Sequence, residues 1–101
     1  MSTLSFSPQA QVDLSNIWDY VALSSGSVEV ADDFIDVLRT RCRELARAPH
    51  VGRLRPELKP GLRTLPFRLY LIVYCEREDM VEIVRVLHGM RDTHRAIAEP
   101  P

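Results

Sequence analysis

The chain has 101 residues, of which 46% are hydrophobic and 27% are charged, and a formal net charge of −1. This composition is typical of one globular domain spanning residues 1–101, and the length is too small for two cores. There is no apolar run of 18 residues, which excludes a membrane-spanning helix, and the N-terminus lacks the pattern of a secretory signal. We therefore expect a cytoplasmic protein.

The charges are divided unevenly along the chain. Residues 1–50 hold seven acids and four bases, net −3, whereas residues 51–101 hold nine bases and seven acids, net +2. Between positions 47 and 68, Glu57 is the one acid among six bases, which are Arg47, Arg53, Arg55, Lys59, Arg63 and Arg68. Such a cluster can bind polyanions, although a solvated arginine-rich loop is at least as common.

The first part of the chain predicts a short strand and a helix. Residues 4–6 suit a strand, and Ser7 and Pro8 suit the N-cap and first position of a helix that ends near Leu23. Its predicted apolar stripe is Leu14, Ile17, Trp18 and Val21, and its predicted polar side is Gln11, Asp13, Asn16 and Asp19. We expect Trp18, on the same stripe, to pack in the core or between helix and sheet and not to stack on a nucleic acid.

A second helix follows the turn at residues 24–27, with Ser27 as its N-cap and Pro49 closing it. Its apolar stripe is Val30 or Ala31, Phe34, Leu38, Cys42 and Leu45. Two helices joined by so short a link form an αα-hairpin, which needs a sheet to cover its apolar side. Cys42 and the later Cys75 have no metal-binding spacing, so we expect two buried free thiols and no disulfide.

The second half of the chain predicts the sheet. Residues 50–60 contain two prolines and a glycine and have no periodic pattern, so we expect an irregular segment, followed by a strand over residues 61–65. Pro66 suits a turn or a sheet edge. Two β-prone runs, Leu69–Cys75 and Met80–Leu87, are separated by a charged tetrapeptide and predict a central hairpin that is buried on both faces.

The predicted order is β-α-α-β-β-β, an α+β fold in which a short N-terminal strand and an αα-hairpin precede a three-stranded antiparallel sheet. A short helix over residues 92–98 could follow.

Polar residues gather where the last predicted strand ends. Arg85 interrupts the apolar row, and His88 and Arg91 follow it, so a rigid sheet positions groups that a partner can reach. The residues that we expect to bind a target are Arg53, Arg55, Arg63, Arg85, His88 and Arg91. Structural roles are the alternative: Arg85 can pair with a carboxylate such as Glu57 or Asp92, His88 can bond to the backbone, and Arg63 can protect a sheet edge.

The order of elements and several stretches resemble one family. The stretches are SPQAQVDLSNIWDYVA, LARAP followed by VGR, RPELKPGLRTLPFRLYLIVY and VEIVRVLHGMRD, which together cover nearly the whole domain. The chain resembles a ParE-type toxin of the ParE/RelE toxin–antitoxin superfamily. Arg68 and Leu69 depart from the pattern, because relatives often have a glycine before Tyr70.

The resemblance implies the toxin of a type II toxin–antitoxin system, held inactive by a cognate ParD-like antitoxin in a hetero-oligomer. ParE-like members poison DNA gyrase and stop replication, so the implied protein is a binding toxin and not an enzyme, with no metal, no small-molecule cofactor and no membrane partner.

The alternative is an mRNA endoribonuclease like RelE. Cleavage through the 2′-hydroxyl needs a base, an acid and a cation around one phosphate, and the candidates here are Arg63, Arg85 and His88, with Glu57 as a further possibility. The sequence has no lysine cluster, and no tyrosine follows His88. We therefore expect a toxin that binds its target.

Overall fold

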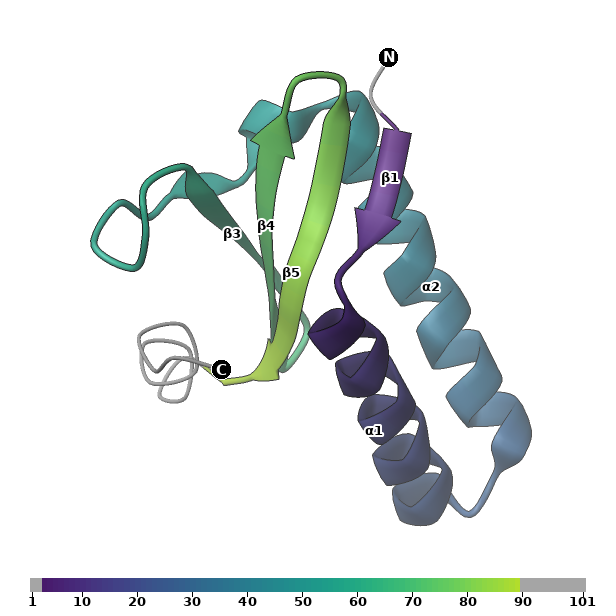
Figure 1. Ribbon diagram of the computed structural model, residues 1–101. Helices are drawn as coiled ribbons and strands as arrows, with labels where there is room; N and C mark the ends of the chain where they lie inside the picture. The colour runs from purple at the N-terminus through teal and green to yellow at the C-terminus, as the bar shows by residue number, and fades with distance from the viewer. Residues whose placement is uncertain (1–2, 90–101) are drawn as a thin grey trace.

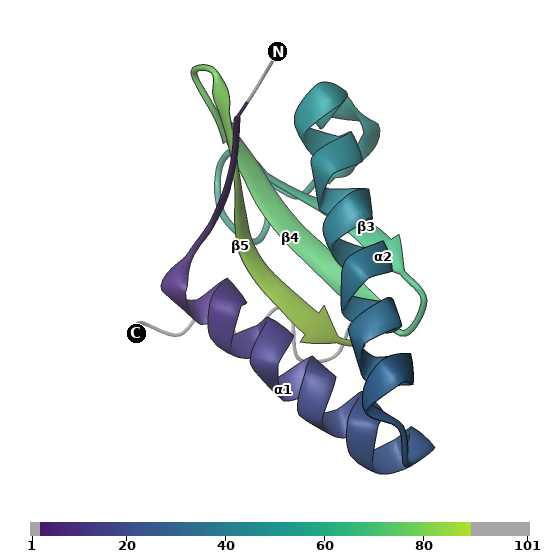
Figure 2. The ribbon, with the colours of Figure 1, turned by 90° about the vertical axis from the view of Figure 1, so that its right-hand side faces the viewer.

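The computed structural model describes residues 3–89 and has the predicted α+β order (Figure 1). The elements are β1 (Thr3–Phe6), α1 (Pro8–Ser25), α2 (Val28–Arg47), the single 3-10 turn η1 (Pro49–Val51), β2 (Arg53–Leu54), β3 (Leu62–Phe67), β4 (Tyr70–Arg77) and β5 (Met80–His88). The strands form one sheet in the order β1-β5-β4-β3-β2. The two helices lie on one face of this sheet (Figure 2).

The sheet has five strands, so the prediction of three was wrong. The central part, β3-β4-β5, is antiparallel as predicted. The N-terminal strand β1 joins it by pairing in parallel with β5, from Thr3 opposite Met80 to Phe6 opposite Ile83. The segment predicted to be irregular contains a two-residue strand, β2, which pairs antiparallel with β3. A strand this short has no periodic pattern, which is why the sequence did not reveal it.

Both helix starts are as predicted. Ser7 caps α1 by accepting a hydrogen bond from the Ala10 N–H at 3.0 Å, and its hydroxyl donates to the Val84 carbonyl at 2.7 Å. Ser27 caps α2 by accepting from the Val30 N–H at 3.1 Å. A serine oxygen satisfies one of the N–H groups that have no partner within the helix. The first cap therefore also ties α1 to β5.

The core lies between the helices and the sheet. Its fully buried side chains include Leu38 and Leu45 of α2 and Ile72, Tyr74 and Ile83 of the sheet. A second cluster on the opposite face of the sheet is closed by Leu58, which comes from the loop between β2 and β3; its other members are Leu62, Val73, Cys75 and Leu87. Burial of β4 on both faces is therefore confirmed.

The hairpin turns are shorter than predicted. Leu69 lies in the turn between β3 and β4 and is 71% exposed, so its assignment to a strand was wrong. Arg68 in the same turn has φ +54°, the region that favours glycine. Pro66 lies within β3 and is exposed, where β2 no longer pairs with that strand, as expected for an edge.

Both cysteines are buried and free, as predicted. Burial raises the pKa of the Cys42 thiol to about 11. In the stretch from residue 3 to residue 89, neither helix is long and apolar enough to cross a membrane. The helix predicted over residues 92–98, and Arg91, lie outside the described residues.

Candidate functional site

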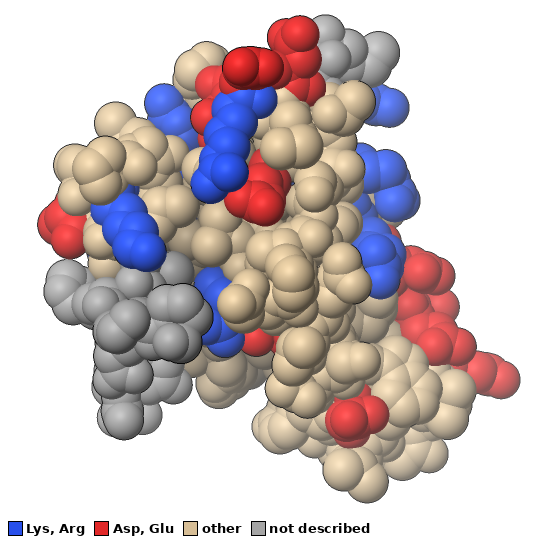
Figure 3. Space-filling model, viewed as in Figure 1, with Lys and Arg blue, Asp and Glu red and all other residues tan. Residues whose placement is uncertain are grey.

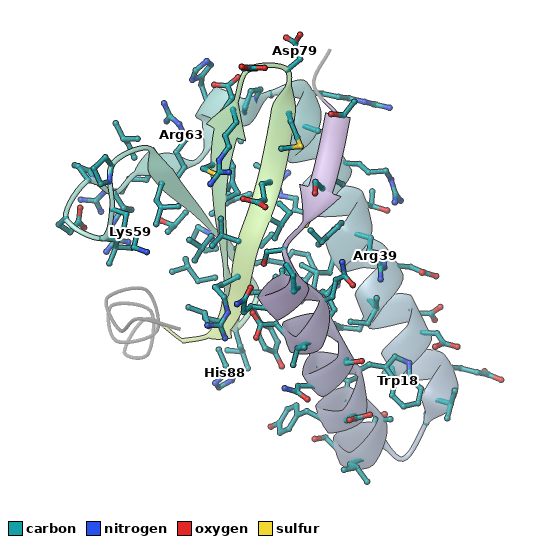
Figure 4. The ribbon with its side chains drawn as sticks, in the orientation of Figure 1. Trp18, Arg39, Lys59, Arg63, Asp79 and His88 are labelled. Carbon is teal, nitrogen blue, oxygen red and sulfur yellow. The ribbon has the colours of Figure 1, made fainter. Side chains whose placement is uncertain are left out.

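A pocket of about 350 Å³ lies at the end of the sheet where α1 and β5 diverge. It is lined mainly by apolar and aromatic side chains, with polar groups from α1. The lining residues are Asp13, Asn16, Ile17 and Tyr20 of α1, Tyr70 of β4, and Val86, Leu87 and His88 of β5. Figure 4 shows His88 at this end of the sheet, at the C-terminal end of β5.

The pocket forms because β1 covers only part of the edge of β5. Pairing with β1 ends at Ile83, whose carbonyl accepts a hydrogen bond from the Ser7 N–H at 2.9 Å. From there α1 continues along the edge, and the Asp13 carboxylate accepts a hydrogen bond from the Val86 N–H at 2.9 Å. Side chains of α1 thus replace a neighbouring strand as far as Val86, and the pocket opens beside the last residues of β5.

Asp13 is also the partner of Arg85. The Arg85 guanidinium donates to this carboxylate from Nε at 2.8 Å and from Nη2 at 3.0 Å. This hydrogen bond raises the pKa of Arg85 above its ordinary value. Asp13 is only 9% exposed, so its placement on the polar side of α1 was wrong. The alternative role of Arg85, pairing with a carboxylate, is present in the structure, but Glu57 is not the partner, because Glu57 binds Arg55 at 2.6 Å.

Aromatic rings connect the pocket to the core. The rings of Tyr70 and His88 are 5.2 Å apart and edge to face, and Tyr20 is 6.5 Å from His88. Phe34 of α2 contacts Tyr70 from the other side at 5.8 Å. Burial raises the pKa of Tyr70. These contacts hold the inner wall of the pocket rigid.

The outer wall of the pocket is exposed. Tyr20 is 59% exposed, and Leu23, one turn further along α1, is 86% exposed. Residues three and four apart lie on one side of a helix, so Ile17, Tyr20 and Leu23 form an apolar ridge that runs from the pocket toward the end of α1. Exposed apolar surface next to a pocket is typical of an interaction site.

A second cluster of polar residues surrounds η1 at the opposite end of the sheet. Arg63 donates from Nη1 to the Gly52 carbonyl at 2.9 Å, and its Nη2 lies 3.2 Å from His50 Nδ1. The Tyr74 hydroxyl donates to the Pro49 carbonyl and accepts from the Gly52 N–H, both at 2.8 Å. Burial raises the pKa of Tyr74. Arg63 therefore fixes the segment after α2 through its backbone.

The basic cluster of residues 47–68 is partly neutralised. Arg55 binds Glu57 and reaches Thr64 Oγ1 at 3.5 Å. The hydrogen bond from Arg55 lowers the pKa of Glu57. Arg53 is exposed on β2.

The structure does not bring the predicted site residues together. Arg63 lies opposite Tyr74, and His88 lies opposite Tyr70. These two tyrosines are four positions apart on β4, a distance of about 13 Å along the strand. Figure 4 shows Arg63 and His88 at opposite ends of the sheet. Arg85 uses two of its nitrogens on Asp13.

Sequence reasoning missed Asp13, Asn16, Tyr20 and Tyr70 as lining residues. The spacing of Ala10, Asp13 and Ile17 could have placed Asp13 on the buried side of α1, since positions three and four apart share a side. In the part of the chain that the structure describes, no three His, Cys, Asp or Glu side chains are placed to hold a metal ion.

Comparison with known proteins identifies the family. A family model described as "ParE toxin of type II toxin-antitoxin system, parDE" matches residues 4–93. The chain is similar to "Toxin ParE1" of Mycobacterium tuberculosis, with 32% identity over 90 residues, covering 88% of this chain and 91% of that protein. It is also similar to "Toxin ParE3" of Caulobacter vibrioides, with 31% identity over 77 residues and 76% of each chain covered.

A solved structure has the same fold. It is described as "Chromosomal ParDE TA system from P. aeruginosa" and superposes with a TM-score of 0.77 at 23% identity, covering 89% of this chain and 98% of the other.

Proposed function

We propose, from the premise that the chain belongs to the ParE toxin family of type II toxin–antitoxin systems, that it binds DNA gyrase and thereby stops DNA replication. A ParD-like antitoxin neutralises it by occupying the pocket between α1 and β5 and the adjacent ridge. Both actions are binding events between proteins in the cytoplasm. No bond is broken by the toxin itself.

The observation that carries this proposal is the pocket with its exposed apolar ridge. An amphipathic helix can place one side chain in the pocket and lay its next turns along Tyr20 and Leu23, which is the helix-in-groove mode of recognition. The pocket is 350 Å³, enough for one large apolar side chain, and rigid aromatic walls are typical of sites that hold such an anchor. His88 and Arg53 are exposed, and we propose them as contacts to the target.

The placement of the cationic groups favours binding over ribonuclease chemistry. Phosphodiester cleavage needs a base, an acid and a cation around a single phosphate. Here Arg85 is held by Asp13, and Arg63 is held by the Gly52 carbonyl at the other end of the sheet. The pocket beside His88 is lined mainly by apolar groups, and its described lining includes no arginine or lysine that could bind a phosphate.

The experiment expresses the chain in bacteria from an inducible promoter, with and without its cognate antitoxin, and measures growth. We expect growth arrest that the antitoxin prevents. In parallel, the purified chain is added to a translation reaction and the 5′ ends of the mRNA are mapped. We expect no new ends. New ends that depend on Arg85 and His88 would overturn the proposal in favour of the endoribonuclease.

A further inference from the structure

The charges of the chain divide within one helix, α2. Residues 1–36 hold six acids and no lysine or arginine, whereas residues 37–55 hold six arginines and one acid, Glu44. Figure 3 shows the result on the right-hand side of the molecule, where basic side chains gather over the upper part of α2 and acidic side chains over its lower part. The net charge of −1 therefore conceals one strongly basic end of this helix.

Three arginines form a row along the C-terminal half of α2. Arg39, Arg43 and Arg47 follow one another at intervals of four residues, about 6 Å apart along the helix axis, and all three are exposed. Leu38 and Cys42, which directly precede two of them, are fully buried and fix this half of the helix to the core. The spacing of the arginine row is therefore set by a rigid element.

No carboxylate within residues 3–89 forms an ion pair with the arginine row. Its first guanidinium lies 5.4 Å from the centre of the Phe6 ring, and its second donates to the Thr40 hydroxyl at 2.9 Å. Glu44 is bound to Arg41 at 3.0 Å. The helix dipole favours cations only in the last turn, so it does not account for Arg39, which lies two turns before the end of α2. The charge of the row is available to a partner.

Exposed arginines at a regular spacing suit the phosphate backbone of DNA. A guanidinium binds a phosphate through two parallel N–H groups. Phosphates of one strand advance about 3.4 Å per nucleotide along a duplex, so every second phosphate repeats at about 6.8 Å, close to the interval of about 6 Å in the row. An acidic protein segment has no such regular repeat. We propose that Arg39, Arg43 and Arg47 form a binding site for the phosphate backbone of duplex DNA.

The proposed contact is weak and independent of DNA sequence. Phosphate contacts position a protein on a duplex and carry no sequence information, and the affinity of such binding is about 10⁻⁴ to 10⁻⁶ M near physiological salt. The same phosphates repel the acidic part of α2, so the chain meets DNA with its basic end.

This DNA contact goes beyond the proposed function. Its use in the cell would be to hold the toxin on the DNA that gyrase carries, and that use alone rests on gyrase being the target. The contact itself can be tested without gyrase or antitoxin, which keeps failure of the two proposals distinguishable.

The experiment measures binding of the full chain to a short fluorescent DNA duplex by fluorescence anisotropy at a series of salt concentrations. Each neutralised phosphate contributes about −0.9 to the slope of log K against log salt concentration. Three arginines therefore predict a slope of about −2.7, which is a loss of about fortyfold in affinity between about 50 and 200 mM salt.

Removal of two arginines should reduce both the affinity and the slope. We expect Arg39→Gln with Arg43→Gln to bind about tenfold more weakly or worse at about 50 mM salt, with a slope of about −0.9. Arg39→Lys with Arg43→Lys keeps both charges and should keep the slope near that of the wild type, which separates the effect of charge from that of packing on the Phe6 ring.

The control variant removes the same charge from another surface. Lys59→Gln with Arg77→Gln changes two exposed bases that lie together beside β3 and β4. Figure 4 shows Lys59 on the opposite side of the molecule from Arg39. We expect this variant to bind DNA with the slope of the wild type.

Several results would overturn the inference. One is no binding at about 50 mM salt with the chain in large excess, and another is equal weakening in the glutamine variant and in the control. Tighter binding of a single-stranded RNA, or of polyglutamate, would assign the row to RNA or to an acidic protein. Growth arrest without DNA binding would remove this inference alone, whereas DNA binding without growth arrest would remove the proposed function alone.

Discussion

The Asp13 carboxylate and the Arg85 guanidinium are joined by two hydrogen bonds of 2.8 and 3.0 Å across 72 residues of sequence. The same carboxylate accepts a hydrogen bond from the Val86 N–H. One side chain therefore neutralises a cation and also supplies an acceptor to the edge of a strand. Asp13 also lines the pocket. This pair therefore sets the distance between α1 and β5, and with it the shape of the candidate site.

Asp13→Ala should lower the free energy of unfolding by about 3 kcal/mol, because it leaves a partly buried guanidinium and the Val86 N–H without their acceptor. Urea denaturation measures the change. Asp19→Ala is the matched control, since Asp19 is exposed on the same helix, and should change stability by less than about 0.5 kcal/mol. A loss no larger than that of the control would contradict the role given to Asp13.

Gly52→Ala should be destabilising by about 2 to 4 kcal/mol through overpacking and a lost hydrogen bond. A Cβ at this position would lie 2.7 Å from Cε1 of the Tyr74 ring and still closer to its hydroxyl. Adding Tyr74→Phe removes the hydroxyl, so the double variant should lose less stability than the two single losses added together. Thermal and urea denaturation of all three variants test this; strictly additive losses would show that the close contact is not the cause.

Glu78→Gly should stabilise the fold by about 0.5 to 1 kcal/mol, and Arg68→Gly should not. Both residues have positive φ, +53° and +54°, which glycine adopts without strain. Only Arg68 has compensating contacts, because its guanidinium lies 5.1 Å from the Phe34 ring and 5.3 Å from the Phe67 ring. Equal gains in urea denaturation would mean that these ring contacts contribute nothing.

Alkaline pH should destabilise the protein through Cys42. Its folded pKa is raised to about 11 from 9.0 by burial, so above pH 9 the unfolded chain releases a proton that the folded chain retains. Stability that is fully present below pH 9 should therefore fall by up to about 1.4 kcal/mol per pH unit toward pH 11. Wild type should lose more stability than Cys42→Ala over this range, and parallel pH profiles would refute the assignment.

Tyr20→Ala should weaken antitoxin binding by about tenfold to a hundredfold, since an exposed aromatic beside a pocket is a typical binding anchor. Isothermal titration calorimetry with the purified antitoxin measures the affinity. Val12→Ala is the control, because Val12 is equally exposed on α1, at 58% against 59%, but does not line the pocket. If Tyr20→Ala binds the antitoxin with unchanged affinity, the antitoxin binds another surface of the toxin. Wild-type toxin should melt at a higher temperature with saturating antitoxin than without it.

Local patterns in the sequence predicted most of the elements. Ser7 and Ser27 identified both helix starts, and the stripe of Leu38, Cys42 and Leu45 identified the buried side of α2. These features depend on neighbours within one or two turns, so a short window of sequence contains them. The pairing of β1 with β5 depends on residues that are 77 positions apart, such as Thr3 and Met80, and no local pattern specifies it.

The candidate site was predicted less well for the same reason. His88 was identified because polar groups at a strand end are visible in sequence, and it does line the pocket. The partner of Arg85 was not, because an aspartate on an amphipathic helix is usually solvated, and only the edge of β5 makes Asp13 a buried acceptor. Whether Arg53, Arg55, Arg63, Arg85, His88 and Arg91 contact a target stays a prediction.

The most direct test of the proposed function measures supercoiling of relaxed plasmid by purified gyrase in the presence of the purified chain, followed by detergent and protease to release trapped DNA breaks. The account predicts loss of supercoiling and accumulation of linear plasmid. Addition of the antitoxin should restore supercoiling and prevent the linear plasmid from forming. Normal supercoiling with the chain in large excess over gyrase would contradict it.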